Sequence, residues 1–445
     1  MMSFEKKWWL LSLIFVVLSC SKQKEPLVVD TDDFHKSVDQ LTSIMIHDIF
    51  SPPVASRVYV YPIVTAYEIL QQKNSNYNSL LGQLNDFPEI PAKPDVENLN
   101  LEVSALVAFM DVGKRLIFSE DKMESYRDSL YSVWGQQNSS EFEVSRDYGL
   151  QVAAKIVSWI DADHYNETRT MPKFTVNLNE KWRWQPTPPD YMNGIEPHWE
   201  HIRTLTLDSA AQFKPVPHPE FSLEEGSKFY SELLEVYEVG LKEQQNGDAS
   251  NEVQIARFWD CNPYVSVHRG HMMFAVKKIT PGAHWIGICK IASKKAGLNL
   301  METLAAYTSA SVSIFDAFIS CWEEKYSSVL IRPENLINKY IDENWLPILQ
   351  TPPFPEYTSG HSVVSGAASV ALTHFFGDNF AFDDDTELPY GLPVRSFTSF
   401  YAASAEAAIS RMYGGIHYRA AIENGLDQGL KLGEHVSKTV QTKAN

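Results

Sequence analysis

The stretch from Pro352 to Gly377 reads "PPFPEYTSGHSVVSGAASVALTHFFG" and joins a proline-rich turn to a run of small and apolar residues. Serine is a favoured helix N-cap and glycine a favoured helix stop, so the pattern predicts a helix that begins within the triplet 359–361 and ends before Gly377. At such a helix start, free N–H groups and the positive end of the helix dipole can bind an anion. The stretch therefore raises the question of what His361 holds there.

Outward from this helix, most of the chain is also predicted to be helical. Residues 33–71, 101–159 and 223–445 show apolar positions at three-to-four spacing and few strand-like alternations. Residues 171–222 differ, because a segment so rich in proline, tryptophan and tyrosine cannot be one continuous helix. We interpret it as a long ordered loop between two helical halves. The predicted fold class is all-α, with packed helical bundles in one compact unit.

The first residues read as a targeting signal rather than as part of the fold. Lys6 and Lys7 precede "WWLLSLIFVVL", an apolar run too short to span a bilayer, and Cys20 follows. This order resembles a bacterial lipoprotein signal, which implies lipidation of Cys20 and anchoring to a membrane of the cell envelope outside the cytoplasm. An ordinary secretory signal with an incidental cysteine is the alternative.

After this signal, the length of the chain and the predicted segment boundaries indicate one large globular protein. With 445 residues, 44% of them hydrophobic, the chain can bury a large core. The predicted segments are a signal peptide at 1–19, a tether at 20–32, an N-terminal helical region at 33–170, the ordered loop at 171–222 and a C-terminal helical domain with the anion site at 223–445.

The net charge and the cysteine content limit which partners and which chemistry the chain can have. A net charge of −18 argues against a general nucleic-acid surface, because such a surface needs a basic stripe. Any bound anion must therefore sit in a locally basic pocket. Besides Cys20, three cysteines lack metal-type spacing and are interpreted as small buried hydrophobes, namely Cys261, Cys289 and Cys321.

The first of three chemical clusters is "KYSSVLIRP". Lys325 and Arg332 are seven residues apart, a spacing that returns to one face of a helix after two turns, although Pro333 disfavours helical geometry at Arg332. Two cations could thus face one pocket. The alternative is a pair of solvated cations that complement a helix dipole.

The other two clusters each add a histidine. Ser359 and Gly360 can supply a hydroxyl and a close backbone approach to an anion, with His361 as a titratable group beside it. In "SRMYGGIHYR" the Gly-Gly turn can fold Arg411 and His417 toward one point. The alternatives are a plain serine cap with an incidental histidine and a plain helix-turn-helix junction.

The joint occurrence of the clusters argues for an oxoanion site. At average residue usage each pattern occurs by chance roughly one time in twenty, and all three in order about one time in ten thousand. Guanidinium groups clamp pairs of oxygens, an ammonium acts as a point charge, and one histidine can bond the central atom while the other moves protons.

At these residues the sequence resembles the superfamily of type 2 phosphatidic acid phosphatases and vanadium-dependent haloperoxidases, and within it bacterial lipoproteins of the haloperoxidase branch. The resemblance implies that His417 is the ligand of vanadate or the nucleophile toward phosphate, and that His361 is the acid-base group. It also implies a set of residues that hold the oxoanion: Lys325, Arg332, Ser359, Gly360 and Arg411.

Two departures from the family pattern stand out. Thr358 occupies the place of a proline, and Ala421 stands where many members carry an aspartate that orients the histidine. Such a ligand normally relies on a second acceptor. Glu423, Asp427 or a backbone carbonyl could take that role. The gap weakens phosphohistidine chemistry more than vanadate binding, because a nucleophile needs its ring activated.

Three functions follow from the resemblance. The first is a vanadate-dependent haloperoxidase that oxidises a halide with hydrogen peroxide at a histidine-bound vanadate, with phosphate as a competitor. The second is a soluble acid phosphatase that cleaves phosphomonoesters through a phosphohistidine. The third is a non-catalytic oxoanion-binding lipoprotein, suggested by Ala421.

Phe354 is the candidate residue of a halide site. It lies seven residues before His361, where the resemblance to chloride-oxidising members implies a ring that dries and narrows the site. We expect oxidation of bromide, and of chloride to a lesser extent. A core aromatic packed under the proline turn is the alternative.

Overall fold

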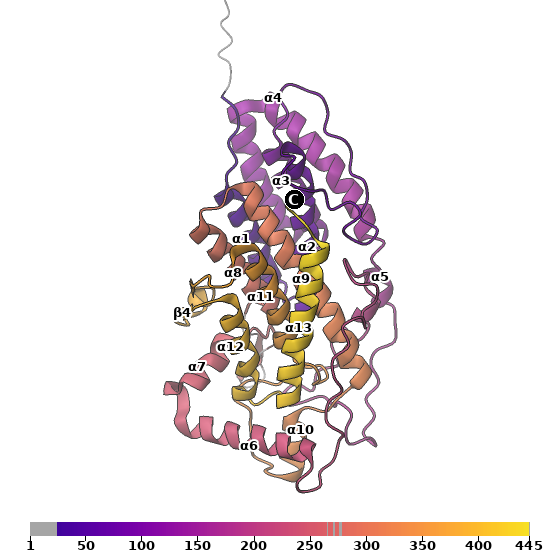
Figure 1. The fold of residues 1–445 in the computed structure, drawn as a ribbon, viewed down its shortest axis with the longest axis vertical. Helices are drawn as coiled ribbons and strands as arrows, with labels where there is room; N and C mark the ends of the chain where they lie inside the picture. Colours follow the sequence, from indigo (N-terminus) through magenta and orange to yellow (C-terminus); the bar gives the residue numbers. More distant parts are fainter. Residues whose placement is uncertain (1–24, 265, 270–271, 276–277, 445) are drawn as a thin grey trace, which may run out of the picture.

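The computed structural model describes residues 25–264, 266–269, 272–275 and 278–444 and confirms the all-α prediction. Helices stack side by side in an elongated body (Figure 1). The α-helices are α1 (Thr31–His47), α2 (Pro52–Leu70), α3 (Leu101–Arg115), α4 (Glu120–Ile160), α5 (Tyr165–Thr168), α6 (Lys228–Asn246), α7 (Asn251–Phe258), α8 (Pro281–Ala296), α9 (Leu300–Ser328), α10 (Pro333–Tyr340), α11 (Gly360–Phe376), α12 (Phe400–Tyr413) and α13 (Arg419–Thr439).

The remaining regular elements are short. Four single-turn helices are η1 (Gln71–Lys73), η2 (Trp199–His201), η3 (Gly247–Ala249) and η4 (Leu388–Tyr390). Two antiparallel strand pairs join β1 (Ser266–Arg269) to β2 (Met272–Ala275) and β3 (Phe382–Asp384) to β4 (Arg395–Phe397). In the second pair Phe382 lies opposite Phe397. These strand pairs are too short to change the all-α fold class.

Helix α9 is the centre of the packing. A capping box between Asn299 and Glu302 starts it, and it packs against α2, α8, α11 and α13. Among the described residues it is the one helix long and apolar enough to cross a membrane, and 94% of its most apolar window is buried inside the protein. One hydrophobic core joins the two helical halves through this helix.

Helices α11 and α13 approach each other closely because glycines line their contact. A Cβ atom on Gly429 would lie 2.1 Å from the Val363 carbonyl oxygen, and one on Gly433 would lie 2.8 Å from the Ala367 carbonyl oxygen. Gly425 brings the same face of α13 to the backbone of Ser359 at the start of α11. The glycine spacing of four residues therefore sets the position of the helix that follows His417.

Replacing Gly429 with alanine is expected to lower the free energy of unfolding by about 1–3 kcal/mol, because the added methyl group would push the two helix backbones apart. Urea unfolding followed by circular dichroism measures this. Gly135→Ala is the control, because its Cβ would meet only Phe142 Cδ1 at 3.8 Å. An equal decrease in the free energy of unfolding in both variants would contradict the role of Gly429 in the contact between α11 and α13.

The proline- and tryptophan-rich loop packs on the end of α9. The Trp184 N–H donates to the Val329 carbonyl at 2.7 Å, and the Ile195 carbonyl accepts from Trp322 Nε1 and from the Tyr326 hydroxyl. The Ile195 N–H donates to the Pro353 carbonyl at 3.1 Å. The loop thus holds the proline turn that precedes α11.

At the N-terminus, helix α1 begins at Thr31, and Leu27 and Val29 are buried. The last residues of the predicted tether therefore pack against the helices. The predicted signal peptide and Cys20 lie outside the described residues.

Candidate oxoanion site

The opening turn of α11 lies where the sequence predicts it. Ser359 is the N-cap residue, its hydroxyl accepts from the Ser362 N–H at 3.3 Å, and the helix ends before Gly377, whose φ is 98°. The Ser359 N–H donates to the Ala421 carbonyl at 3.0 Å, which ties this turn to α13. Ser359 therefore stabilises the start of α11 through both its backbone and its side chain.

Lys325 and Arg332 do not share a helix face. Helix α9 ends at Ser328, and Arg332 has extended geometry with ψ at 149° as the cap residue before Pro333. The same-face interpretation is therefore wrong, because the chain leaves the helix between the two cations. Tertiary packing still places both 5.1 Å from the centre of the Phe354 ring.

Lys325 is fully buried and donates to three backbone carbonyls, those of Pro355, Glu356 and Thr358. All three belong to the turn before α11. Burial lowers the pKa of Lys325 to about 8, and the nearby Arg332 guanidinium adds to this effect. The lysine thus holds the turn in shape and places a positive charge under it.

The two guanidinium groups are buried and only partly paired. Arg332 Nε donates to the Phe354 carbonyl and Nη1 to the Ile416 carbonyl, each at 2.9 Å. Arg411 Nη1 donates to the Trp259 carbonyl at 2.8 Å. Arg332 Nη2 and Arg411 Nε have no partner among the described residues. Buried N–H groups are normally paired, so these two donors suit an anionic acceptor.

His417 is oriented by Glu356, a residue that motif reasoning missed. His417 Nδ1 lies 2.8 Å from Glu356 Oε1, which also accepts from the Tyr418 N–H at 2.9 Å. Because Oε1 acts as an acceptor in both contacts, Nδ1 carries the proton and Nε2 carries the lone pair that can act as a ligand. Nε2 faces Arg332 Nη1 at 3.0 Å. Burial and the Arg332 charge hold the pKa of His417 well below its usual value, which keeps the ring neutral.

Glu356 corrects the expectation for the orienting acceptor. Glu423 pairs with Arg419, and Asp427 pairs with Lys431 on the solvent side of α13, so neither reaches His417. Ala421 contributes its carbonyl to Ser359. Glu356 lies in the proline turn five residues before His361, and the sequence shows only that it is the one acid in that turn.

His361 lies in the first turn of α11 with its Nε2 buried and without a partner among the described residues. Burial and the Arg411 charge hold its pKa well below the usual value, while a hydrogen bond with the Trp259 carbonyl opposes them. A neutral ring with one unpaired nitrogen can accept or deliver a proton there.

One cavity brings most of the predicted residues together. Its polar lining includes Gly360, His361, Arg411 and His417, while Phe318, Trp322 and Phe354 form its apolar side. The Phe354 and Trp322 ring centres are 5.0 Å apart. Lys325 and Arg332 stand behind Phe354, so the ring both packs under the turn and borders the cavity. The site is a cationic pocket with one apolar side and two neutral histidines.

Raising the pH above about 8 is expected to weaken vanadate binding, because Lys325 then loses its charge. Its pKa lies below the usual lysine value, so the ammonium is present below that pH and is lost above it, by up to about tenfold in affinity per pH unit. Titration of vanadate at fixed pH steps measures this. Lys325→Arg, which stays charged, should show a flatter dependence of vanadate affinity on pH. If the parent and Lys325→Arg show the same pH dependence, Lys325 does not control vanadate binding through its charge.

Fold and site together define a class: an all-α protein with a cationic pocket that suits a tetrahedral oxoanion. A family model described as the VCPO second helical-bundle domain matches residues 305–445. No curated protein matched the chain in a sequence comparison.

Solved structures extend the likeness over nearly the whole chain. A bacterial vanadium-dependent iodoperoxidase is 61% identical with a TM-score of 0.92, over 95% of this chain and all of that one. The holo form of a bacterial vanadium-dependent chloroperoxidase is 17% identical with a TM-score of 0.68, over 93% of this chain and 98% of that one, and therefore shows the fold alone. The chain belongs to the family of vanadium-dependent haloperoxidases, oxidoreductases that use vanadate with hydrogen peroxide and a halide.

Proposed function

We propose that the protein binds vanadate through His417 and oxidises iodide with hydrogen peroxide. The observation that carries the proposal is the state of His417: its Nδ1–H donates to Glu356 Oε1, so the Nε2 lone pair faces the guanidinium of Arg332. A neutral imidazole in a cationic pocket combines a ligand for the central atom with charges for its oxygens.

The other site residues divide the remaining tasks. Arg332 and Arg411 would hold oxygens with their unpaired N–H groups, and Lys325 adds charge from behind the turn. His361 would hold or release a proton at Nε2. Phe354 and Trp322 limit the water in the pocket, which strengthens these charge interactions. Bound vanadate would supply the electrophilic centre that activates hydrogen peroxide toward the halide.

Iodide is the halide that the combined evidence favours. The iodoperoxidase with 61% identity supports this choice, and we propose iodide in place of the bromide, and to a lesser extent chloride, expected from the sequence. The apolar side of the cavity supports it as well, because a large and weakly hydrated anion loses less hydration on entering such a site.

A halide series on vanadate-reconstituted protein tests the proposal. We expect hydrogen-peroxide-dependent oxidation of iodide, with a kcat/KM above that for bromide and little turnover of chloride. Phosphate should inhibit by competing for the same pocket. Bromide turnover equal to iodide turnover, or no iodide oxidation after vanadate loading, would contradict the assignment.

Phosphomonoester hydrolysis is a second candidate, favoured by the contact between His417 and Glu356. A phosphohistidine mechanism needs a histidine whose second nitrogen is held by an acceptor, and Glu356 Oε1 at 2.8 Å provides it. A phosphatase assay on vanadate-free protein decides this candidate. Hydrolysis that His417→Ala abolishes would support it.

We also propose that the protein is attached to a bacterial cell-envelope membrane through lipid on Cys20. The proposal is supported by the signal pattern at residues 1–20, which precede the described part of the chain. Cell fractionation of Cys20→Ala beside the parent measures this. Membrane retention of both proteins would contradict it.

A further inference from the structure

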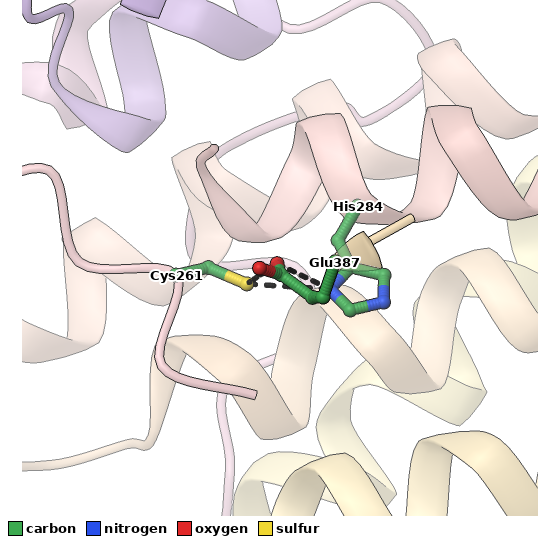
Figure 2. A group of neighbouring side chains, drawn as sticks. All are labelled: Cys261, His284 and Glu387. Atoms are coloured by element: carbon green, nitrogen blue, oxygen red, sulfur yellow. Dashed lines mark hydrogen bonds and ion pairs between the residues drawn. The ribbon is translucent and has the colours of Figure 1, made fainter. Parts of the chain in front are cut away.

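A buried cluster of Cys261, His284 and Glu387 lies beside the oxoanion pocket, which Cys261 also lines. Figure 2 shows the three side chains pointing toward one another from the loop after α7, from helix α8 and from the residue before η4. Cys261 Sγ lies 3.3 Å from His284 Nδ1 and 3.8 Å from Glu387 Oε1, and these last two atoms are 3.5 Å apart. Among the described residues this is the one such group of potential metal ligands.

We propose that Cys261, His284 and Glu387 bind a zinc ion. Zinc bonds of about 2.0–2.3 Å at tetrahedral angles place the ligand atoms about 3.3–3.6 Å from one another, close to the three observed distances. A thiolate and an imidazole nitrogen exclude magnesium and calcium, which prefer oxygen ligands. Three protein ligands leave a tetrahedral ion one position for water.

A second layer of contacts already prepares His284 as a ligand. Its Nε2 lies 2.8 Å from Asp384 Oδ2, and Thr386 bonds to the same carboxylate through its N–H and its hydroxyl. Because the carboxylate only accepts, Nε2 carries a proton, and Nδ1, which faces Cys261 and Glu387, is the nitrogen that would bind a metal. A carboxylate, a histidine and a metal in this order are a common arrangement in zinc proteins.

The charge balance also favours a cation. The Cys261 and Glu387 side chains are both buried, so each is costly to ionise alone. A divalent ion would compensate a thiolate and a carboxylate together. Cys261 also lines the oxoanion cavity, which offers an entry path.

The zinc content of the purified full chain tests the proposal. After chelator treatment and reloading with Zn²⁺, we expect about one equivalent per chain, as measured by mass spectrometry of the metal. Cys261→Ser and Glu387→Gln keep the side-chain size and should lose most of it. Asp384→Asn should weaken zinc affinity by about 10–100-fold, because it removes the group that orients His284.

Two further measurements separate this site from other zinc binding. Cys289→Ser changes a buried thiol that lies on α8 and outside the proposed zinc site, so this variant should keep full zinc content. Co²⁺ loading should give a thiolate charge-transfer band in the parent and in Cys289→Ser but not in Cys261→Ser. Added zinc should raise the thermal unfolding temperature of the parent and not of Cys261→Ser. Equal zinc content in the parent and in a folded Cys261→Ser, or no zinc in either, would overturn the proposal.

Discussion

Replacing His417 with alanine is expected to abolish tight vanadate binding, because it removes the nitrogen assigned to the central atom. His417 Nε2 carries the lone pair that would bind vanadium, and the neighbouring cations offer only hydrogen bonds and charge. Loss of an orienting contact alone costs about 10–100-fold in metal affinity, so loss of the ligand should cost more. Equilibrium dialysis with vanadate at fixed pH measures this.

His361→Ala is the matched comparison, since both rings line the same cavity. It should leave vanadate affinity within a few-fold and lower kcat by about 10²–10⁴-fold, the usual contribution of a positioned acid-base group. Binding and turnover should therefore separate between the two variants. An equal loss of affinity in both would refute the assignment of ligand and proton-transfer roles.

Glu356→Gln is expected to weaken vanadate binding by about 10–100-fold, because it replaces the carboxyl group that orients His417. Glutamine keeps the size and an acceptor oxygen, so the Tyr418 N–H retains a partner. Glu356→Ala should bind more weakly still, since it leaves both donors unpaired. Isothermal titration with vanadate gives the affinities, and thermal unfolding shows whether each variant is folded.

The controls for Glu356 are Glu423→Gln and Asp427→Asn on α13. Both side chains pair with cations one helical turn away, Arg419 and Lys431. These variants should bind vanadate as the parent does. If either one weakens binding as much as Glu356→Gln does, the orienting role belongs to α13 and not to the proline turn.

The start of α11 shows what local sequence can predict about a site. A serine cap, a following glycine and a distant glycine stop act within a few residues of the positions they control, so the helix from Gly360 to Phe376 was predictable with its ends. The Gly-Gly turn before His417 acts in the same local way: Gly415 adopts a φ of 76°, and Arg411 and His417 reach one cavity.

The pairing of Lys325 with Arg332 shows where periodicity misleads. Seven residues return to one helix face only while the helix continues, and α9 stops at Ser328 with Val329 in a left-handed conformation. The two cations meet at Phe354 because the proline turn passes between them. A tertiary contact thus achieves what the helical spacing does not.

The sequence by itself determined the helical class, the ends of α11 and the motif residues of the pocket, because caps, glycines and apolar periodicity act through neighbours in the chain. Only the tertiary structure decided which acid orients His417, since Glu356 comes from the proline turn 61 residues away. The same holds for Cys261, His284 and Glu387, which no spacing connects. Side chains so distant in sequence meet only when helices pack, so their chemistry depends on packing and not on local pattern.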